Sequence, residues 1–350
     1  MRRLLLAGAA AVALPASVLA QEADSATITF GAFLDGYYAY DLGRPESGDR
    51  AFTTQAARHD EFAVNLAHVE ARYASAKVRG RLALQAGTSV QVNYSGEPDE
   101  LGGTDNFFPH VQEAVVGVNV APSLWIDGGI MFSHIGSESW ISIDNPTYTR
   151  SLPSEFAPYY SAGVRATWQA TPTISAQVNV VNGWQNISEN NEDKAVGVRL
   201  DWNATPALTL SYANFIGREA HASTGDHDVR VFNDFVARWA PNDRALLIFT
   251  GDVGTQEDDD WYAASLAGRW WLTPTVGING RVERFDDEDG VVSAGLRATG
   301  ASLGIDVQRG PAMWRTEVRT LFGDDDLFED RDDGLSDTNT VLVTSLSVRL

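Results

Sequence analysis

Apolar and polar residues alternate with a period of two along most of this chain, a pattern typical of β-strands that have one apolar face. From Gly80 to Tyr94 the even positions are mainly apolar or small, and the odd positions are mainly polar. The same alternation recurs over 173–180, 276–283 and 342–350. Predicted strands of roughly ten to fifteen residues are long for a soluble sandwich but suit tilted membrane strands. The pattern therefore favours a transmembrane β-barrel, with a soluble β-sandwich as the alternative.

Proline-containing turns punctuate the alternation. Proline cannot donate to a β ladder, so it is expected between strands. A repeat in the thirties suits two strands, one short turn and one longer loop. These prolines are Pro122, Pro172, Pro206, Pro241, Pro274 and Pro311, at intervals of 50, 34, 35, 33 and 37 residues.

Aromatic residues are expected to form two belts at the membrane interfaces. Four tryptophans, each just before a proline turn, predict one belt: Trp168, Trp202, Trp239 and Trp270. On the same strand faces, Tyr160 and Tyr262 lie eight residues before Trp168 and Trp270. The opposite belt is predicted to include Tyr40, Tyr94, Phe132, Trp184 and Phe322.

Counting turns and loops predicts an all-β, closed antiparallel barrel of about 16 strands, with 14 as the alternative. Both termini then lie on the periplasmic side, with the short turns. The least regular segments are 62–73, where the phase slips, and 228–239, where Asn233 falls on the lipid face. Short turns are predicted near 75–79, 121–123, 169–172, 203–207, 240–244, 273–274 and 308–311. Longer extracellular loops are predicted near 42–58, 95–109, 133–158, 183–193, 217–228, 254–260, 286–297 and 323–337.

The first twenty residues resemble a secretion signal. Arg2 and Arg3 precede an apolar run from Leu4 to Leu14, and small residues before Gln21 suit cleavage after Ala20. That run is too short for a membrane anchor, which needs about 20 apolar residues. We therefore expect a signal peptide over 1–20, a single barrel domain over 21–350, and localisation in a bacterial outer membrane.

Composition narrows the choice of partners. The chain has no cysteine and a formal net charge of −21, which argues against binding of nucleic acid. No pattern indicates a cofactor, a metal site or a catalytic group. The acidic runs at 257–260, 286–289, 324–326 and 329–333 fall in predicted outer loops and are expected to be solvated. Binding of divalent cations with lipopolysaccharide is the alternative for these runs. The runs also predict a weak preference for cations, which arginines on the inner wall oppose.

The longest predicted connection, 133–158, combines charged residues with apolar ones. Trp140, Ile141 and Ile143 could anchor it to the inner wall, so we expect it to fold into the barrel and set the narrowest point. An external lid and a subunit contact are the alternatives. The predicted constriction residues are His134, Glu138, Asp144, Tyr148, Arg150 and Glu155.

Arginines recur on the polar faces of the predicted strands. Glu138, Asp144 and Arg150 are expected to face the path opposite wall arginines such as Arg79, Arg81 or Arg165. Most wall charges are expected to form local ion pairs in a hydrated lumen. The predicted wall residues are Arg79, Arg81, Glu113, Arg165, Arg199, Arg281, Arg315 and Arg319.

Several segments resemble the putative β-barrel porin-2, or OmpL-like, family of outer-membrane proteins. They are 58–67, 79–88, 124–142, 148–152 and 181–191, and the likeness is most specific between 124 and 193. The resemblance implies an outer-membrane channel without a cofactor.

The leading functional prediction is a porin through which small hydrophilic solutes or ions diffuse passively. An outer-membrane enzyme and a structural or adhesive barrel with a plugged lumen are the alternatives. Outer-membrane lipid, lipopolysaccharide and further copies in a homotrimer are the other expected partners.

Overall fold

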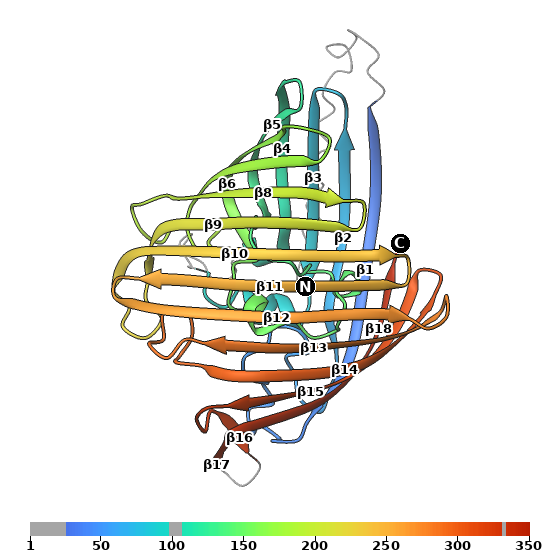
Figure 1. Cartoon of the computed structure of the whole chain (residues 1–350), viewed down its shortest axis with the longest axis vertical. Helices are drawn as coiled ribbons and strands as arrows, with labels where there is room; N and C mark the ends of the chain where they lie inside the picture. The colour runs from blue at the N-terminus through green and yellow to red at the C-terminus, as the bar shows by residue number, and fades with distance from the viewer. Residues whose placement is uncertain (1–25, 98–106, 331–333) are drawn as a thin grey trace, which may run out of the picture.

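The computed structural model describes residues 26–97, 107–330 and 334–350, so the predicted signal peptide lies outside the described residues. Sixteen antiparallel strands close into one barrel (Figure 1). This confirms the higher of the two predicted strand counts. The strands are β1 (Thr27–Asp41), β2 (Phe62–Ala74), β3 (Val78–Ala86), β4 (Val111–Ala121), β5 (Leu124–Phe132), β6 (Tyr160–Gln169), β7 (Ile174–Val181), β8 (Ala195–Thr205), β9 (Leu208–Ala220), β10 (His227–Asn242), β11 (Ala245–Gln256), β12 (Asp259–Trp271), β13 (Val276–Asp286), β14 (Arg297–Arg309), β15 (Ala312–Gly323) and β18 (Thr338–Arg349).

All seven predicted short turns are confirmed. Each joins two consecutive strands, from the β2–β3 turn to the β14–β15 turn. The tryptophans before the proline turns are half exposed, at 53% for Trp168 and 50% for Trp202, as a lipid-facing belt requires. Two predicted loops are shorter than expected, because β11 and β12 leave only 257–258 between them, and β9 and β10 leave only 221–226. In both places the strands extend beyond the predicted loop bounds.

The phase slip in β2 is a β-bulge. Asp35 pairs with Leu66 and Gly36 pairs with Val64, so Asn65 is the extra residue. The bulge turns Asn65 inward, where its Nδ2 donates to Asp35 Oδ2 at 3.0 Å. Asn233 does lie on the outer face of β10, and its side chain accepts a hydrogen bond of 2.8 Å from Tyr212.

The predicted strand from Gly80 to Tyr94 is wrong in its second half. β3 ends at Ala86, and helix α1 (Thr88–Asn93) follows. Gly87 has φ 143°, and a Cβ there would lie 2.2 Å from the Asn65 carbonyl oxygen. Only glycine therefore fits this sharp turn.

Three aromatics assigned to the membrane belts pack inside the protein instead. Tyr94 and Tyr160 stack at 4.1 Å between ring centroids. Trp184 makes edge contacts with Phe232 and Trp261. Period-two alternation could not reveal this, because it does not distinguish lipid from a buried protein neighbour.

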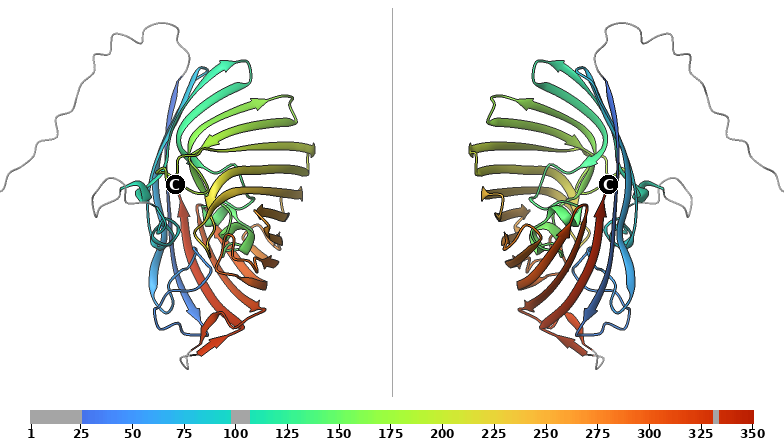
Figure 2. Two further views of the ribbon diagram at one scale, coloured as in Figure 1. Left: turned by 90° about the vertical axis from the view of Figure 1, so that its left-hand side faces the viewer. Right: turned by 90° about the vertical axis from the view of Figure 1, so that its right-hand side faces the viewer.

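The remaining elements lie in the loops. They are η1 (Phe108–His110), η2 (Ser142–Asp144), α2 (Leu152–Glu155) and a small hairpin of β16 (Phe328–Asp330) and β17 (Gly334–Ser336). Within the described ranges, the helices are all too short or too polar to cross a membrane. Figure 2 shows α2 within the ring of strands, between the blue β1 and β2 and the orange strands opposite.

Candidate functional site

The connection between β5 and β6, residues 133–159, runs inside the barrel and is called the inner loop below. It reaches inward-facing residues on widely separated strands. Ser142 Oγ donates to Asp35 Oδ2 on β1 at 2.8 Å, and Leu152 N donates to Glu283 on β13 at 2.6 Å. The loop therefore crosses the lumen rather than covering the barrel from outside.

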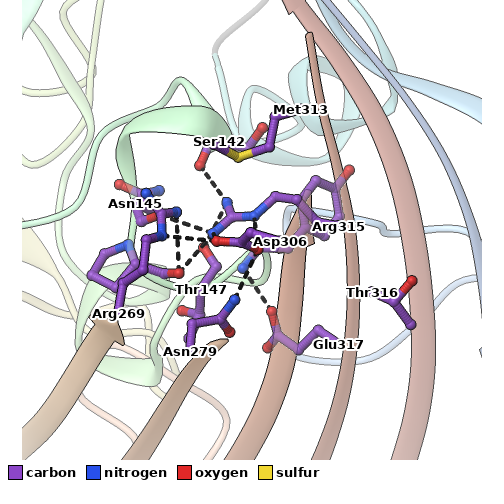
Figure 3. Close-up of polar contacts among 12 residues, drawn as sticks. Ser142, Asn145, Thr147, Arg269, Asn279, Asp306, Met313, Arg315, Thr316 and Glu317 are labelled. Carbon is purple, nitrogen blue, oxygen red and sulfur yellow. Dashed lines mark hydrogen bonds and ion pairs between the residues drawn. The ribbon is translucent and has the colours of Figure 1, made fainter. Parts of the chain in front are cut away.

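Arginines on β12 and β15 hold the loop through its carbonyl oxygens (Figure 3). Arg315 donates to the carbonyls of Ser142 at 2.8 Å and Pro146 at 2.6 Å. Arg269 donates to the carbonyls of Asn145 and Pro146, the latter at 3.2 Å. Asp306 on β14 pairs with both guanidinium groups, at 2.8 Å for Arg269 and 2.9 Å for Arg315. A loop in the interior needs such partners because its backbone cannot reach bulk water.

Further partners come from the same wall. Arg281 donates to Thr147 Oγ1 and to the Thr149 carbonyl, both at 2.6 Å. Glu317 accepts from the backbone nitrogens of Tyr148 at 2.6 Å and Thr149 at 3.0 Å. The Tyr148 hydroxyl donates to Asp35 at 3.2 Å, and the Tyr148 side chain is buried. Tyr148 therefore does not face an open path.

His134 joins the loop to strands β8 and β9. The β8–β9 pairing is interrupted between Val196 and Arg199, and there His134 Nε2 lies 2.8 Å from the Asn214 carbonyl oxygen. Since a carbonyl only accepts, Nε2 carries the proton and donates. Burial lowers the pKa of His134 to about 4, so the imidazole is neutral at pH 7. Arg199 Nη1 also donates to the His134 carbonyl at 2.8 Å.

Arg150 does not face the path, contrary to the sequence prediction. Its side chain is completely buried, with the guanidinium carbon 4.9 Å from the Trp140 ring centroid and close to the Tyr159 ring. Glu155 lies 3.6 Å from Arg150, and it accepts a 2.7 Å hydrogen bond from the Thr54 hydroxyl in the β1–β2 loop. These two residues therefore join the inner loop to another loop.

Asp144 lies at the short-turn end of the barrel. It forms a bidentate ion pair with Arg349, at 2.7 and 2.8 Å, instead of pairing with a predicted wall arginine. A hollow of about 380 Å³ opens beside it, next to Gln308 and Pro311. Glu138 accepts from Ser151 N at 2.9 Å, and burial raises the pKa of its carboxyl group.

The predicted wall arginines divide into two groups. Those on β13 and β15 are buried, with 0% side-chain exposure for Arg281 and 1% for Arg315 and Arg319. Arg319 binds Glu283 at 2.8 Å. This group holds the loop, either directly or through the acids that bind the loop backbone.

The arginines on β3, β6 and β8 keep contact with solvent. Side-chain exposure is 37% for Arg79, 18% for Arg81, 21% for Arg165 and 20% for Arg199. Each pairs with acidic side chains: Asp127 for Arg79 and Arg165, Glu70 and Glu113 for Arg81, and Asp201 for Arg199. Arg199 alone among these four also donates to the inner loop, at the His134 carbonyl.

Sequence reasoning omitted two central residues, Asp306 and Thr54. Asp306 could have been predicted from the sequence. Leu303 and Ile305 point outward on β14, and alternation then places Asp306 inside the barrel. No local signal marks Thr54, because its role depends on two loops that meet in space.

The barrel is similar to solved outer-membrane channels. The outer membrane channel DcaP of Acinetobacter baumannii aligns with a TM-score of 0.64 at 11% identity, covering 94% of this chain and 99% of that one. A trimer form of OmpT from Vibrio cholerae gives a TM-score of 0.60 at 12% identity, covering 93% and 100%. An anion-selective porin from Comamonas acidovorans gives 0.58 at 10% identity, again covering 93% and 100%. At these identities the likeness shows the fold alone.

A comparison with curated proteins gave no match. A sequence model described as "Putative beta-barrel porin-2, OmpL-like" matches residues 27–350, which include the whole barrel. The chain therefore belongs to this family of β-barrel porins.

Proposed function

We propose that this protein lets small hydrophilic solutes and ions diffuse passively across the outer membrane. The observation that carries the proposal is the unequal exposure of the wall arginines. The inner loop covers those on β13 and β15, whereas Arg79 on β3 is 37% exposed. A hydrated strip of charged wall along β3–β8 supplies a route for solutes, and the loop narrows it.

The proposal includes export and assembly. The apolar run from Leu4 to Leu14 supports a signal peptide over 1–20, and the half-exposed tryptophan belt supports contact with membrane lipid. A homotrimer is supported by the trimer form of the similar OmpT barrel. Contact with lipopolysaccharide is proposed for the acidic outer loops.

A planar bilayer measurement tests the proposal. Protein refolded in detergent should insert and give stepwise increases in conductance. Insertion can be verified separately by protection of the strands from protease. Barrels that insert but never conduct would contradict the porin function and support a plugged structural barrel.

The charged residues of the lumen have two roles in this proposal. Those that the inner loop covers hold the loop, as Arg281 and Arg315 do through their hydrogen bonds to it, and the more exposed ones, such as Arg79, guide solutes.

A further inference from the structure

A second hollow, of about 350 Å³, lies at the long-loop end of the barrel. Five separate interstrand connections and the start of β6 contribute to it. This volume is near the lower limit of small-molecule sites, which begin at about 300 Å³. The hollow is called the outer hollow, and the lining residues that matter are Thr54, Asn93, Tyr160, Trp184, Gln185 and Asn186.

The described lining of the outer hollow offers no unpaired charge. Among the described residues that line it, Glu155 has the only charged side chain. Both of its carboxylate oxygens accept from Thr54 N at 3.1 Å, and Arg150 lies 3.6 Å away. A charged ligand would have no opposite charge to replace its hydration, so an uncharged ligand is favoured.

Two buried amides have hydrogen-bonding capacity to spare. Asn93 and Asn186 are only 8% and 7% exposed, and within the described part of the chain neither Nδ2 has a hydrogen-bond partner. Buried polar groups normally have partners, so an unpartnered one calls for an explanation such as a missing ligand. Trp184, which is partly exposed, adds aromatic surface beside these amides. Amides with aromatic rings suit a ligand that has both hydroxyl groups and C–H faces.

The lining is held in place by hydrogen bonds behind it. Gln185 has φ 63°, a left-handed conformation that is unfavourable for a residue with a side chain. Its side chain accepts from Tyr159 N at 2.9 Å and donates to the Asn93 carbonyl at 3.4 Å. Glu97 accepts from Ile187 N at 2.8 Å. Strained residues fixed in this way are frequent at ligand clamps, and a rigid lining lowers the entropy lost on binding.

We propose that the outer hollow binds an uncharged, polyhydroxylated solute of one or two sugar rings before it enters the lumen. This inference rests on the proposed porin function and names its substrate class. Amide donors would satisfy hydroxyl oxygens, and the partly exposed ring of Trp184 would cover C–H surface. The absence of a free charge explains why a charged metabolite of the same size would bind less well.

Sucrose added to the long-loop side of single channels tests the inference. We expect brief current interruptions whose frequency rises with sucrose concentration, whereas gluconate and an uncharged polyethylene glycol of similar size should cause few. Asn93→Leu and Trp184→Ala should each weaken the apparent affinity about fivefold to tenfold. Trp184→Phe should retain most of it. Trp202→Ala, on the lipid face, is the matched control and should behave as wild type.

Calorimetry on the detergent-solubilised barrel separates failure of the site from failure of the channel. Sucrose binding that Asn93→Leu weakens supports the site even if no conductance is seen, in which case only the porin proposal fails. Conducting wild-type channels that sucrose neither blocks nor binds would overturn the site and leave the porin proposal intact. Equal sucrose affinity in wild type and both folded variants would also overturn it.

Discussion

A missing side chain at Gly197 lets His134 reach the barrel wall. A Cβ at this position would lie 2.3 Å from His134 Nε2 and 2.5 Å from the Asn214 carbonyl oxygen. Backbone cannot move away easily within a β-ladder, so the imidazole would have to leave. One glycine thus determines whether the first part of the inner loop is fastened to β8 and β9.

Gly197→Ala should therefore release the start of the inner loop. We expect noisier and larger single-channel currents, because losing one buried hydrogen bond costs about 0.5–1.5 kcal/mol and frees the loop to fluctuate. Gly217→Ala is less suitable as a control, since it would crowd Ala195, whereas Gly96→Ala meets no atom of the described residues within 4 Å and should be silent. Wild-type currents from Gly197→Ala would contradict this role for His134.

The His134 contact should also depend on pH. Its pKa in the folded protein is about 4, below the usual 6.5, because of burial and the nearby Arg199 and Arg165. The contact should be stable above pH 6.5 and should weaken as pH falls toward 4. The reason is that His134 binds a proton more readily when it is released from Asn214 than when it is buried against it. Current noise should rise over this range. His134→Gln can still donate a hydrogen bond to Asn214 but cannot bind a proton, so the rise in current noise at low pH should be absent. An unchanged pH response in this variant would contradict a role for His134 protonation.

At the scale of elements, the inner loop is the point where sequence and structure agree only in part. Its length and its apolar residues Trp140 and Ile141 predicted an inward course, and both side chains are buried. The partners of its charges were not predictable, because Asp144 meets Arg349 across 205 positions of sequence. Arg150 was misplaced for a similar reason, since its aromatic neighbours come together only when the loop folds.

The strands were more predictable than the loops. Period-two alternation and proline turns are local signals, and each reports directly on one strand or turn. The error at α1 shows the limit, because Thr88–Asn93 alternates like a strand yet forms a helix after the turn at Gly87.

Arg281 offers a test of how the wall holds the loop. Arg281→Met removes its hydrogen bonds to Thr147 and Thr149, while Glu283 keeps its ion pair with Arg319. Bonds from a charged donor are worth about 1.5–3 kcal/mol each, so the loop should open more often. Mean conductance should rise, and protease should cut the loop faster. Arg165→Met, which loses an ion pair with Asp127 but has no hydrogen bond to the loop, is the matched control for protease cleavage of the loop.

At the scale of the whole molecule, the barrel reverses the usual arrangement of a soluble protein. Apolar side chains such as Leu303 and Leu346 are exposed at 76% and 57% on the outside, where lipid replaces water. Inside, charged networks and three apolar clusters pack the inner loop against the wall. The lumen is therefore a partly filled interior with one accessible side, rather than an empty cylinder.

Charge is distributed unevenly along this interior, and selectivity should follow it. Acidic outer loops concentrate cations at the long-loop mouth, whereas accessible arginines such as Arg79 and Arg165 favour anions further inside. We expect a weak net preference for cations that fades at high salt, because the screening length falls from about 10 Å at 0.1 M to 3 Å at 1 M. Replacing Asp258, Asp259 and Asp260 by asparagine should move the reversal potential toward anions. Replacing Arg79 and Arg165 by glutamine should move the reversal potential toward cation preference. This shift should be larger than the one from the aspartate substitutions, because charges beside a narrow path are screened less by salt. A reversal potential that neither set of substitutions changes would mean that ions pass along another part of the barrel.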